Sequence, residues 1–213
     1  MKDFQREFLD FAIACEALRF GEFTLKSGRI SPYFFNTGLF NTGRKLAQLG
    51  KFYACAINDS GLAFDMVYGP AYKGVPLACA TAISLAEDDG RDVPYAFNRK
   101  EAKKHAEGGI IVGHPVEGKV LIVDDVISAG LSVRESVQII KTAGATPIGV
   151  AIAVDRQERG EGARSAVQEV ETTLGLRVVS IVALDTLLKY LEGKDGLAQH
   201  LDAINAYHRA YGT

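Results

Sequence analysis

Two adjacent acidic residues follow an apolar run of the sequence and precede a loop of small residues. The run 120–123 reads VLIV, Asp124 and Asp125 come next, and residues 126–132 lead into a helical pattern. Free backbone N–H groups in such a loop, together with the dipole of the helix that follows, suit a phosphate. Two carboxylates close to that anion must face hydroxyls, a cation or a developing positive charge, because like charges repel. Phosphate on one side and hydroxyls on the other predict a bound ribose 5-phosphate.

The two serines of this loop admit two interpretations. Ser128 and Ser132 could add hydroxyl donors to the phosphate site. Alternatively, one of them caps the following helix and Asp124 is an ordinary turn acid. The loop alone leaves both interpretations open, since short motifs also match by chance.

A second candidate site lies at residues 69–74, where GPAYKG follows another apolar run. Gly69 and Gly74 allow the backbone to come close to a ligand, and Lys73 offers an ammonium group at the start of a helix. A pyrophosphate would fit there. The alternative is a plain strand-to-helix turn with a solvated Lys73.

A run of basic residues follows a third apolar segment. Residues 99–105 read RKEAKKH, with five basic side chains in seven positions, and Gly108 and Gly109 follow as flexible joints. A charge run is most often a solvated surface. Next to a ligand that carries many negative charges, it is better explained as a mobile lid over about 99–110 that closes over pyrophosphate and excludes water.

The composition limits the classes of protein to which the chain can belong. Of its 213 residues, 47% are hydrophobic and 23% charged, which is typical of a compact globular domain. The net charge of −2 offers no global attraction to nucleic acid. Three cysteines without C-x-x-C spacing argue against a disulfide framework and a zinc site, and they fit a reducing compartment. Because we find neither a membrane span nor a signal-peptide pattern, we expect a cytoplasmic protein without membrane or nucleic-acid partners.

Hydrophobic periodicity predicts the elements that must position these residues. Helices are expected over 3–18 and 42–58, and 20–43 reads as the short β-like pieces of a small N-terminal α+β cap. From residue 65 on, helical patterns alternate with runs that are apolar on both faces. This is typical of an α/β fold with a doubly wound, mostly parallel sheet, in which ligands bind at the carboxyl ends of the strands. The expected strands are 65–69, 93–98, 119–125, 146–155 and 177–185, and the further expected helices are 75–87, 132–143 and 197–211.

The segment VLIVDDVISAG at 120–130 is similar to the signature with which type I phosphoribosyltransferases bind phosphoribosyl pyrophosphate (PRPP). More narrowly, the whole chain resembles the orotate phosphoribosyltransferases, and the matching segments are KSGR at 26–29, SPYFFN at 31–36, GPAYKG at 69–74, RKEAKKH at 99–105 and VDRQE at 154–158. The resemblance implies an enzyme of pyrimidine biosynthesis that transfers the phosphoribosyl group of PRPP to orotate, giving orotidine 5′-monophosphate and pyrophosphate. It implies a type I phosphoribosyltransferase fold, with residues 1–60 as a cap that contributes to the base pocket and 61–213 as the PRPP-binding core.

The resemblance also assigns roles to individual residues. Those expected to take part in catalysis are Asp124 and Asp125, which would hold the ribose hydroxyls, with Lys73, Lys103 and His105. These five are also expected to contact PRPP, and further contacts to it are expected from Tyr72, Arg99, Lys100, Val126, Ile127, Ser128, Ala129, Gly130, Leu131 and Ser132. A guanidinium can pair with the planar carboxylate of orotate. The residues expected to meet orotate are Lys26, Phe34, Phe35, Ser128 and Arg156.

Two further expectations concern the cofactor and the partner. The resemblance implies that Mg²⁺ arrives with PRPP, and it assigns no residue as a direct metal ligand. In the family the lid reaches into the active site of the partner subunit, which implies a homodimer. Arg99, Lys103 and His105 would then act across the interface, Lys26 would lie near the adjoining site, and Lys100 would contact PRPP in its own chain.

One position departs from the family pattern. The family usually has Thr where Leu131 stands. A side-chain hydrogen bond to the phosphate is therefore expected to be missing, which costs roughly 1.5–3 kcal/mol if nothing replaces it. We expect weaker PRPP binding in this chain than in its Leu131→Thr variant.

Three rival interpretations can be set beside this one. A type I phosphoribosyltransferase for another base would share the PRPP loop, but it should lack Lys26, the Phe34–Phe35 pair and Arg156. A non-enzymatic PRPP-sensing regulator should carry a basic nucleic-acid face or an added DNA-binding domain, and neither is evident in the sequence. A receiver-like domain also places two acids beside a strand, but it would leave the long loop and the basic lid unexplained.

Overall fold

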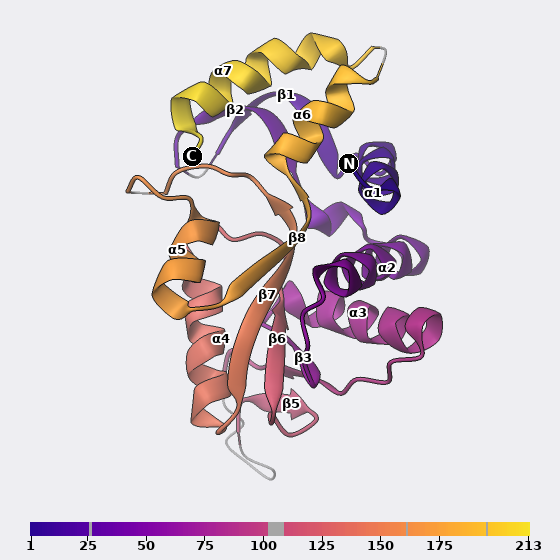
Figure 1. Ribbon diagram of the computed structural model, residues 1–213, viewed down its shortest axis with the longest axis vertical. Coiled ribbons are helices and arrows are strands. Elements are labelled where there is room, and N and C mark those ends of the chain that lie inside the picture. Colours follow the sequence, from indigo (N-terminus) through magenta and orange to yellow (C-terminus); the bar gives the residue numbers. More distant parts are fainter. Residues whose placement is uncertain (26, 102–108, 161, 195) are drawn as a thin grey trace.

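The structure is a computed structural model that describes residues 1–25, 27–101, 109–160, 162–194 and 196–213. Its centre is a six-stranded sheet in the order β5-β4-β3-β6-β7-β8 (Figure 1). Neighbouring strands run parallel except β5, which pairs antiparallel with β4 at the edge, so the expected mostly parallel sheet is confirmed. The strands are β3 (Met66–Gly69), β4 (Tyr95–Asn98), β5 (Ile111–Gly113), β6 (Lys119–Val123), β7 (Thr146–Asp155) and β8 (Arg177–Ala183).

Both faces of this sheet are buried, which explains why its strands read as continuous apolar runs. In β6, Val120 and Ile122 lie on one face and Leu121 and Val123 on the other, and all four are inaccessible to solvent. None of the helices in the described part of the chain has the length and apolar composition to span a bilayer. One face is covered by α2 (Gly43–Ser60) and α3 (Gly74–Asp89), and the other by α4 (Leu131–Thr142) and α5 (Ala166–Leu174) (Figure 1).

The order of the parallel strands creates a point at which the chain reverses its direction across the sheet. From β3 the chain crosses outward to β4, and it then returns past β3 to form β6, β7 and β8 on the other side. Ligands of open α/β sheets bind at such a switch point, outside the carboxyl ends of the strands. Both predicted ligand segments, 69–74 and 124–132, begin there, after β3 and β6 respectively.

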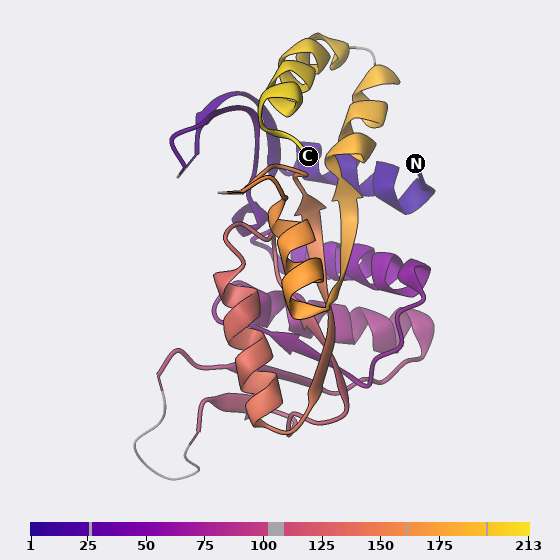
Figure 2. The ribbon, with the colours of Figure 1, turned by 60° about the vertical axis from the view of Figure 1, so that its left-hand side comes forward.

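A second, smaller layer, which we call the hood, covers the carboxyl ends of the strands. It consists of the antiparallel hairpin β1 (Leu18–Thr24) and β2 (Ile30–Phe35), helix α1 (Asp3–Ala14), and helices α6 (Leu184–Glu192) and α7 (Leu201–Tyr211). Figure 2 shows the hairpin and α7 together above the sheet, and α7 contacts β2. The hood thus joins the two ends of the chain, whereas α2 packs against α3 on the sheet. The division at residues 60 and 61 stays a prediction.

The sequence patterns do not predict β5, α5 and α6. β5 has three residues and α5 and α6 nine each, which is too short for a clear period. The last strand, expected over 177–185, ends at Ala183, because α6 follows it without a loop. The first helix, expected over 3–18, ends at Ala14, because Glu16 has a positive φ of 57° that turns the chain towards β1.

Candidate active site

The acid pair Asp124–Asp125 lies directly after β6, at the switch point of the sheet. Asp124 Oδ1 accepts a hydrogen bond from the Asp125 amide at 2.9 Å, and Asp124 Oδ2 accepts one from the Ser132 hydroxyl at 2.9 Å. The hydroxyl of Tyr53, a buried residue of α2, donates to the Asp124 carbonyl at 2.7 Å. These contacts fix the pair at the tip of a buried strand. Ser132 therefore donates to the acid pair in this structure, and its contact with PRPP stays a prediction.

Burial changes the acidity of the first of these carboxyls. Because Asp124 is shielded from water and Asp125 adds a like charge beside it, the pKa of Asp124 rises to about 6. The hydrogen bonds from the Asp125 amide and from Ser132 act in the opposite direction and are outweighed. Asp124 consequently exchanges its proton close to neutral pH.

The second carboxyl, that of Asp125, contacts both a cation and a hydroxyl. Asp125 Oδ2 lies 2.5 Å from the Lys73 ammonium and accepts a hydrogen bond from the Thr37 hydroxyl at 3.2 Å. The Lys73 side chain is 63% exposed, so its ammonium also reaches solvent. Thr37 belongs to a short 3-10 helix, η1 (Thr37–Leu39), which follows β2. The hood therefore touches the acid pair directly.

The 69–74 loop packs tightly against the end of β6. A Cβ on Gly69 would lie 2.2 Å from the Gly74 carbonyl oxygen, and a Cβ on Gly74 would lie 2.8 Å from the Val123 carbonyl oxygen. The two glycines are thus required for close approach of backbone to backbone, rather than to a ligand as the sequence suggested. Asn98 Oδ1 holds the loop by accepting from the Ala71 amide at 3.1 Å. The Ala71–Tyr72 peptide bond is cis.

The phosphate loop contains backbone N–H donors that are not used by the described part of the chain. Gly130, with a φ of 68°, precedes the first turn of α4, where the helix dipole is positive. The Val126 amide donates to Asp125 Oδ1 at 2.9 Å. The amides of residues 127–131 donate to no other described residue. Leu131 is 67% exposed and leaves the mouth of the loop without a hydroxyl donor at that position.

Arg156 follows the end of β7 and is enclosed by polar groups of the hood. Its Nε donates to Glu158 Oε1 at 2.8 Å, its Nη2 donates to Ser31 Oγ at 3.0 Å, and its Cζ lies 4.3 Å from the centre of the Tyr33 ring. Burial by itself would lower the pKa of Arg156, but Tyr33 and Glu158 raise it above its usual value. The guanidinium therefore stays charged and is held in one orientation.

Phe34 and Phe35 point to opposite faces of β2, as consecutive residues of a strand must. The Phe34 ring stacks on Phe23 at 5.5 Å between centroids, whereas the Phe35 ring packs against Phe8 at 6.1 Å. Phe35 shares its face with Tyr33, which contacts Arg156. The structure thus brings Phe35, but not Phe34, to the side of the strand that faces Arg156.

The basic segment is described only in part. The Arg99 amide donates to the Ile110 carbonyl at 2.6 Å, and the Lys100 ammonium lies 5.0 Å from the centre of the Tyr72 ring. An open pocket of about 610 Å³ beside the 69–74 loop is lined by Tyr72, Pro76, Phe97, Arg99 and Lys100, among others. Three predicted site residues, Lys26, Lys103 and His105, lie outside the described residues.

The donor set of the site fits a metal ion that a ligand brings with it. In the described ranges, His, Cys, Asp and Glu side chains form no group of three that could hold a metal ion. Among the described residues, Asp124 and Asp125 are the carboxylates that directly follow β6. Mg²⁺ is commonly held by one or two carboxylates together with phosphate oxygens of the substrate. The acid pair suits that arrangement, with no further protein ligand required.

β7 connects the acid pair with Arg156. The Ala153 amide donates to the Asp125 carbonyl at 2.9 Å, and Arg156 follows three residues later, which corresponds to roughly 10 Å of extended chain. The two predicted halves of the site, one for the sugar phosphate and one for the base, therefore lie within the length of one nucleotide.

Several residues of the site were not predicted from the sequence: Ser31, Tyr33, Thr37, Tyr53, Asn98 and Glu158. Most of their contacts join positions far apart in the chain, and no local pattern signals such contacts. Glu158 is the exception, because it stands two residues after Arg156 in the segment VDRQE.

Comparison with known proteins identifies one family by sequence and by structure. The phosphoribosyl transferase domain matches residues 38–174. Orotate phosphoribosyltransferases from Thioalkalivibrio sulfidiphilus and Klebsiella pneumoniae are 63% and 59% identical to this chain over 213 residues, the full length of both sequences in each pair. A crystal structure of orotate phosphoribosyltransferase from Francisella tularensis is similar with a TM-score of 0.88 and 40% identity, covering 97% of this chain and 100% of that one. The similarity extends over the hood as well as the sheet.

Proposed function

The chain belongs to the orotate phosphoribosyltransferases, and we propose that its strand-end site transfers the 5-phosphoribosyl group of PRPP to N1 of orotate. The products are orotidine 5′-monophosphate and pyrophosphate, so the enzyme serves pyrimidine biosynthesis. The observation that supports this most is that an acid pair and a loop whose amides donate to no described residue follow the same strand tip. Such a tip suits a ligand that carries hydroxyls and a phosphate together.

The sugar-phosphate half supplies electrostatic stabilisation, and no side chain attacks the sugar. The 5-phosphate accepts hydrogen bonds from the amides of residues 127–131, at the positive end of α4. Asp124 and Asp125 hold the ribose hydroxyls, and their charge favours the oxocarbenium character that C1 gains as the bond to pyrophosphate breaks. Lys73 moves from Asp125 to the departing pyrophosphate, which its exposed position allows.

The base half recognises orotate by its carboxylate. Arg156 lies within reach of a base attached to a sugar at Asp125, and a charged guanidinium donates strong hydrogen bonds to a carboxylate. A neutral purine has no such group. Phe35 supplies an apolar wall on the same face of β2, and Phe34 and Ser128 remain proposed contacts of orotate.

We propose that PRPP binds together with Mg²⁺, for which the acid pair would supply the protein ligands. When bound, the ion neutralises charge on the departing pyrophosphate. Asp124 and Asp125 would be its protein partners, directly or through water. The ammonium groups of Lys73, beside the acid pair, and of Lys100, in the wall of the open pocket, would act on the same leaving group.

We also propose a homodimer in which the basic segment of one subunit completes the site of the other. Tyr72 is 71% exposed beside Lys73, which is unusual for a large aromatic side chain and leaves a surface open to such a segment. Arg99, Lys103 and His105 are the residues proposed to act across the interface, and Lys26 is proposed to lie near it. Mixing inactive Asp125→Asn and Lys103→Ala proteins should restore activity, since hybrid dimers contain one intact site. Continued inactivity of a verified hybrid would contradict shared sites.

The direct test of the reaction uses the ultraviolet absorbance of orotate. Purified protein mixed with PRPP, Mg²⁺ and orotate should consume orotate and release pyrophosphate. Hypoxanthine and xanthine serve as controls for the alternative of another base, and they should give no product. Consumption of either purine without consumption of orotate would overturn the proposed substrate, and PRPP binding without any turnover would favour a sensing role.

A further inference from the structure

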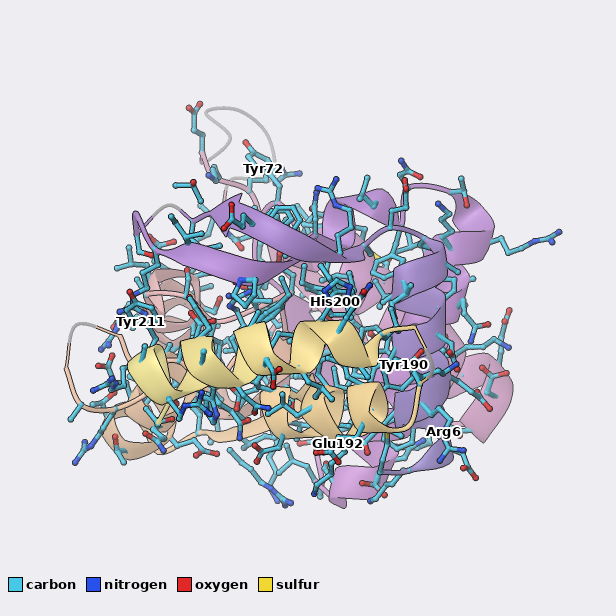
Figure 3. All side chains as sticks on the ribbon, turned by 90° about the horizontal axis from the view of Figure 1, so that it is seen from above. Arg6, Tyr72, Tyr190, Glu192, His200 and Tyr211 are labelled. Carbon is cyan, nitrogen blue, oxygen red and sulfur yellow. The ribbon has the colours of Figure 1, made fainter. Side chains whose placement is uncertain are left out.

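Glu158 lies at the centre of a buried polar cluster that joins separate segments of the hood. Its carboxylate, 12% exposed, pairs with the Arg156 guanidinium at 2.6 Å. The hydroxyls of Tyr33 in β2 and Tyr207 in α7 donate to it at 3.4 and 3.1 Å, and Arg29 Nη1 lies 4.0 Å from its Oε2. Figure 3 shows α7 alongside the hairpin that carries Tyr33, with Tyr211 at the C-terminal end of the helix. The reaction proposed above makes no direct use of Glu158.

The contacts of Arg156 leave one end of its guanidinium available. Nε and Nη2 are engaged by Glu158 and by the Ser31 hydroxyl, and the Tyr33 ring covers one face. Nη1 donates to none of the residues that the structure describes. A guanidinium held in this way loses little conformational freedom when it meets a ligand carboxylate, and pre-organised groups bind more tightly for that reason.

The Glu158 side chain is not needed to attach the C-terminus to the rest of the protein. Backbone contacts already do so, because the Arg159 amide donates to the Tyr211 carbonyl at 2.8 Å and the Thr213 amide donates to the Gln157 carbonyl at 3.0 Å. A carboxylate at this depth loses hydration, which is unfavourable. Its contacts must therefore provide an effect other than attachment of the C-terminus. Its short bonds to Arg156 indicate where that effect lies.

We propose that Glu158 is a positioning residue that holds Arg156 in the orientation needed to receive the orotate carboxylate, which presupposes the role of Arg156 proposed above. Tyr207 adds a hydrogen bond to the same carboxylate, so α7 takes part in recognition of the base from the far end of the chain. Replacement of Glu158 by a neutral group weakens the hold on Arg156 and lets the guanidinium turn away from the base. PRPP, which binds at the other half of the site, is unaffected.

The test compares the Michaelis constants of the two substrates in Glu158→Gln, a variant of nearly equal size. We expect the KM for orotate to rise about tenfold, the scale of one charged hydrogen bond, and the KM for PRPP to stay within about twofold. Glu158→Asp keeps the charge but shortens the side chain, and it should give a smaller rise. Tyr207→Phe removes only one neutral hydrogen bond to Glu158, so it should give the smallest rise in the KM for orotate, less than about threefold.

A double-mutant comparison separates positioning from a merely structural role. In an Arg156→Ala background, Glu158→Gln should not raise the KM for orotate any further, because its effect passes through Arg156. Equal rises for both substrates, additive effects with Arg156→Ala, or an unchanged KM for orotate in folded Glu158→Gln and Glu158→Asp proteins would each overturn the inference. If Arg156→Ala itself left the KM for orotate unchanged, the proposed role of Arg156 would fail first, and the inference with it.

Discussion

The ion pair Lys73–Asp125 in one half of the site and the ion pair Arg156–Glu158 in the other differ in how their basic side chains are held. In the sugar-phosphate half, the Lys73 side chain is 63% exposed and its ammonium contacts Asp125, whose side chain is 11% exposed. In the base half, the Arg156 and Glu158 side chains are 20% and 12% exposed, and Ser31 and the Tyr33 ring add further contacts to the arginine.

This difference indicates two ways of handling charge in one active site. Lys73 is exposed, so its ammonium is solvated and can exchange Asp125 for a phosphate, while the Thr37 hydroxyl still donates to Asp125. A buried pair is not broken so easily, because loss of one partner leaves an uncompensated charge. The sugar-phosphate half is therefore suited to exchanging partners during turnover, whereas the base half is suited to keeping its shape.

The largest expected effect concerns Asp125, the acid proposed to hold the ribose beside the reacting carbon. Asp125→Asn removes a charge that favours the oxocarbenium character of C1, so we expect turnover to fall about 100-fold or more. Because the base half is separate, the KM for orotate should remain within about twofold. Steady-state kinetics with both substrates varied provides the measurement. Near-normal turnover would reject the role of Asp125.

A smaller but selective effect is expected at the exposed cation. Lys73→Gln should lower kcat/KM for PRPP by about 10–100-fold, the scale of a charged hydrogen bond to pyrophosphate. The thermal midpoint should fall less than for a pair that is buried on both sides, because Lys73 is exposed and Asp125 keeps its hydrogen bond from Thr37. Lys51→Gln breaks a pair that is exposed on both sides, Lys51–Asp88, outside the site and should alter neither quantity. A large fall in thermal stability for Lys73→Gln alone would remove the contrast between the two pairs.

The raised pKa of Asp124 predicts how stability depends on pH. Its pKa is about 6 in the folded protein and 3.8 in an ordinary setting, so the folded state favours the protonated form. Ionised Asp124 is therefore unfavourable for folding: the penalty is absent below about pH 4, grows through about pH 6 and is complete above it. Asp124→Asn should remove the penalty and raise the free energy of unfolding by about 2–3 kcal/mol at about pH 8, but by little at about pH 4.

Thermal denaturation of both proteins at the two pH values tests this expectation. The midpoint of Asp124→Asn should exceed that of the unaltered chain by roughly 5–10 °C at the higher pH, and the gap should close at the lower one. A gap that is independent of pH would show that Asp124 is not a source of electrostatic strain. In that case the sugar-phosphate half would carry no more electrostatic strain than the base half.

The smallest effect is expected at Leu131. Its side chain is 67% exposed at the start of α4, so Leu131→Thr costs little packing and places a hydroxyl near the proposed phosphate. We expect the KM for PRPP to fall by up to about tenfold, with no change in the KM for orotate. An unchanged KM for PRPP would show that the backbone amides of the loop already satisfy the phosphate.

The sugar-phosphate half could be predicted from the sequence because it is nearly contiguous. Asp124, Asp125 and the phosphate loop follow one strand, and Lys73 follows the strand beside it. The apolar runs that predict a parallel sheet also predict that these strand ends meet. The alternation of strands and helices was therefore enough to place both segments at the switch point.

The base half could not be predicted in the same way. Arg156 was identified by resemblance, but its partners come from β2 and from the turn after β7, and Glu158 is reached in turn by α7. Their meeting depends on how the hood folds over the sheet, and no periodicity encodes it. For the same reason Phe34 and Phe35 were expected to act together, although their side chains lie on opposite faces of β2.

The most direct test of the whole site is a crystal structure of the protein soaked with the product, orotidine 5′-monophosphate. We predict that its 5′-phosphate lies against the amides of residues 127–131, its ribose hydroxyls against Asp124 and Asp125, and its carboxylate against Arg156. A nucleotide bound elsewhere, or one that reaches the phosphate loop while its base points away from Arg156, would contradict the account.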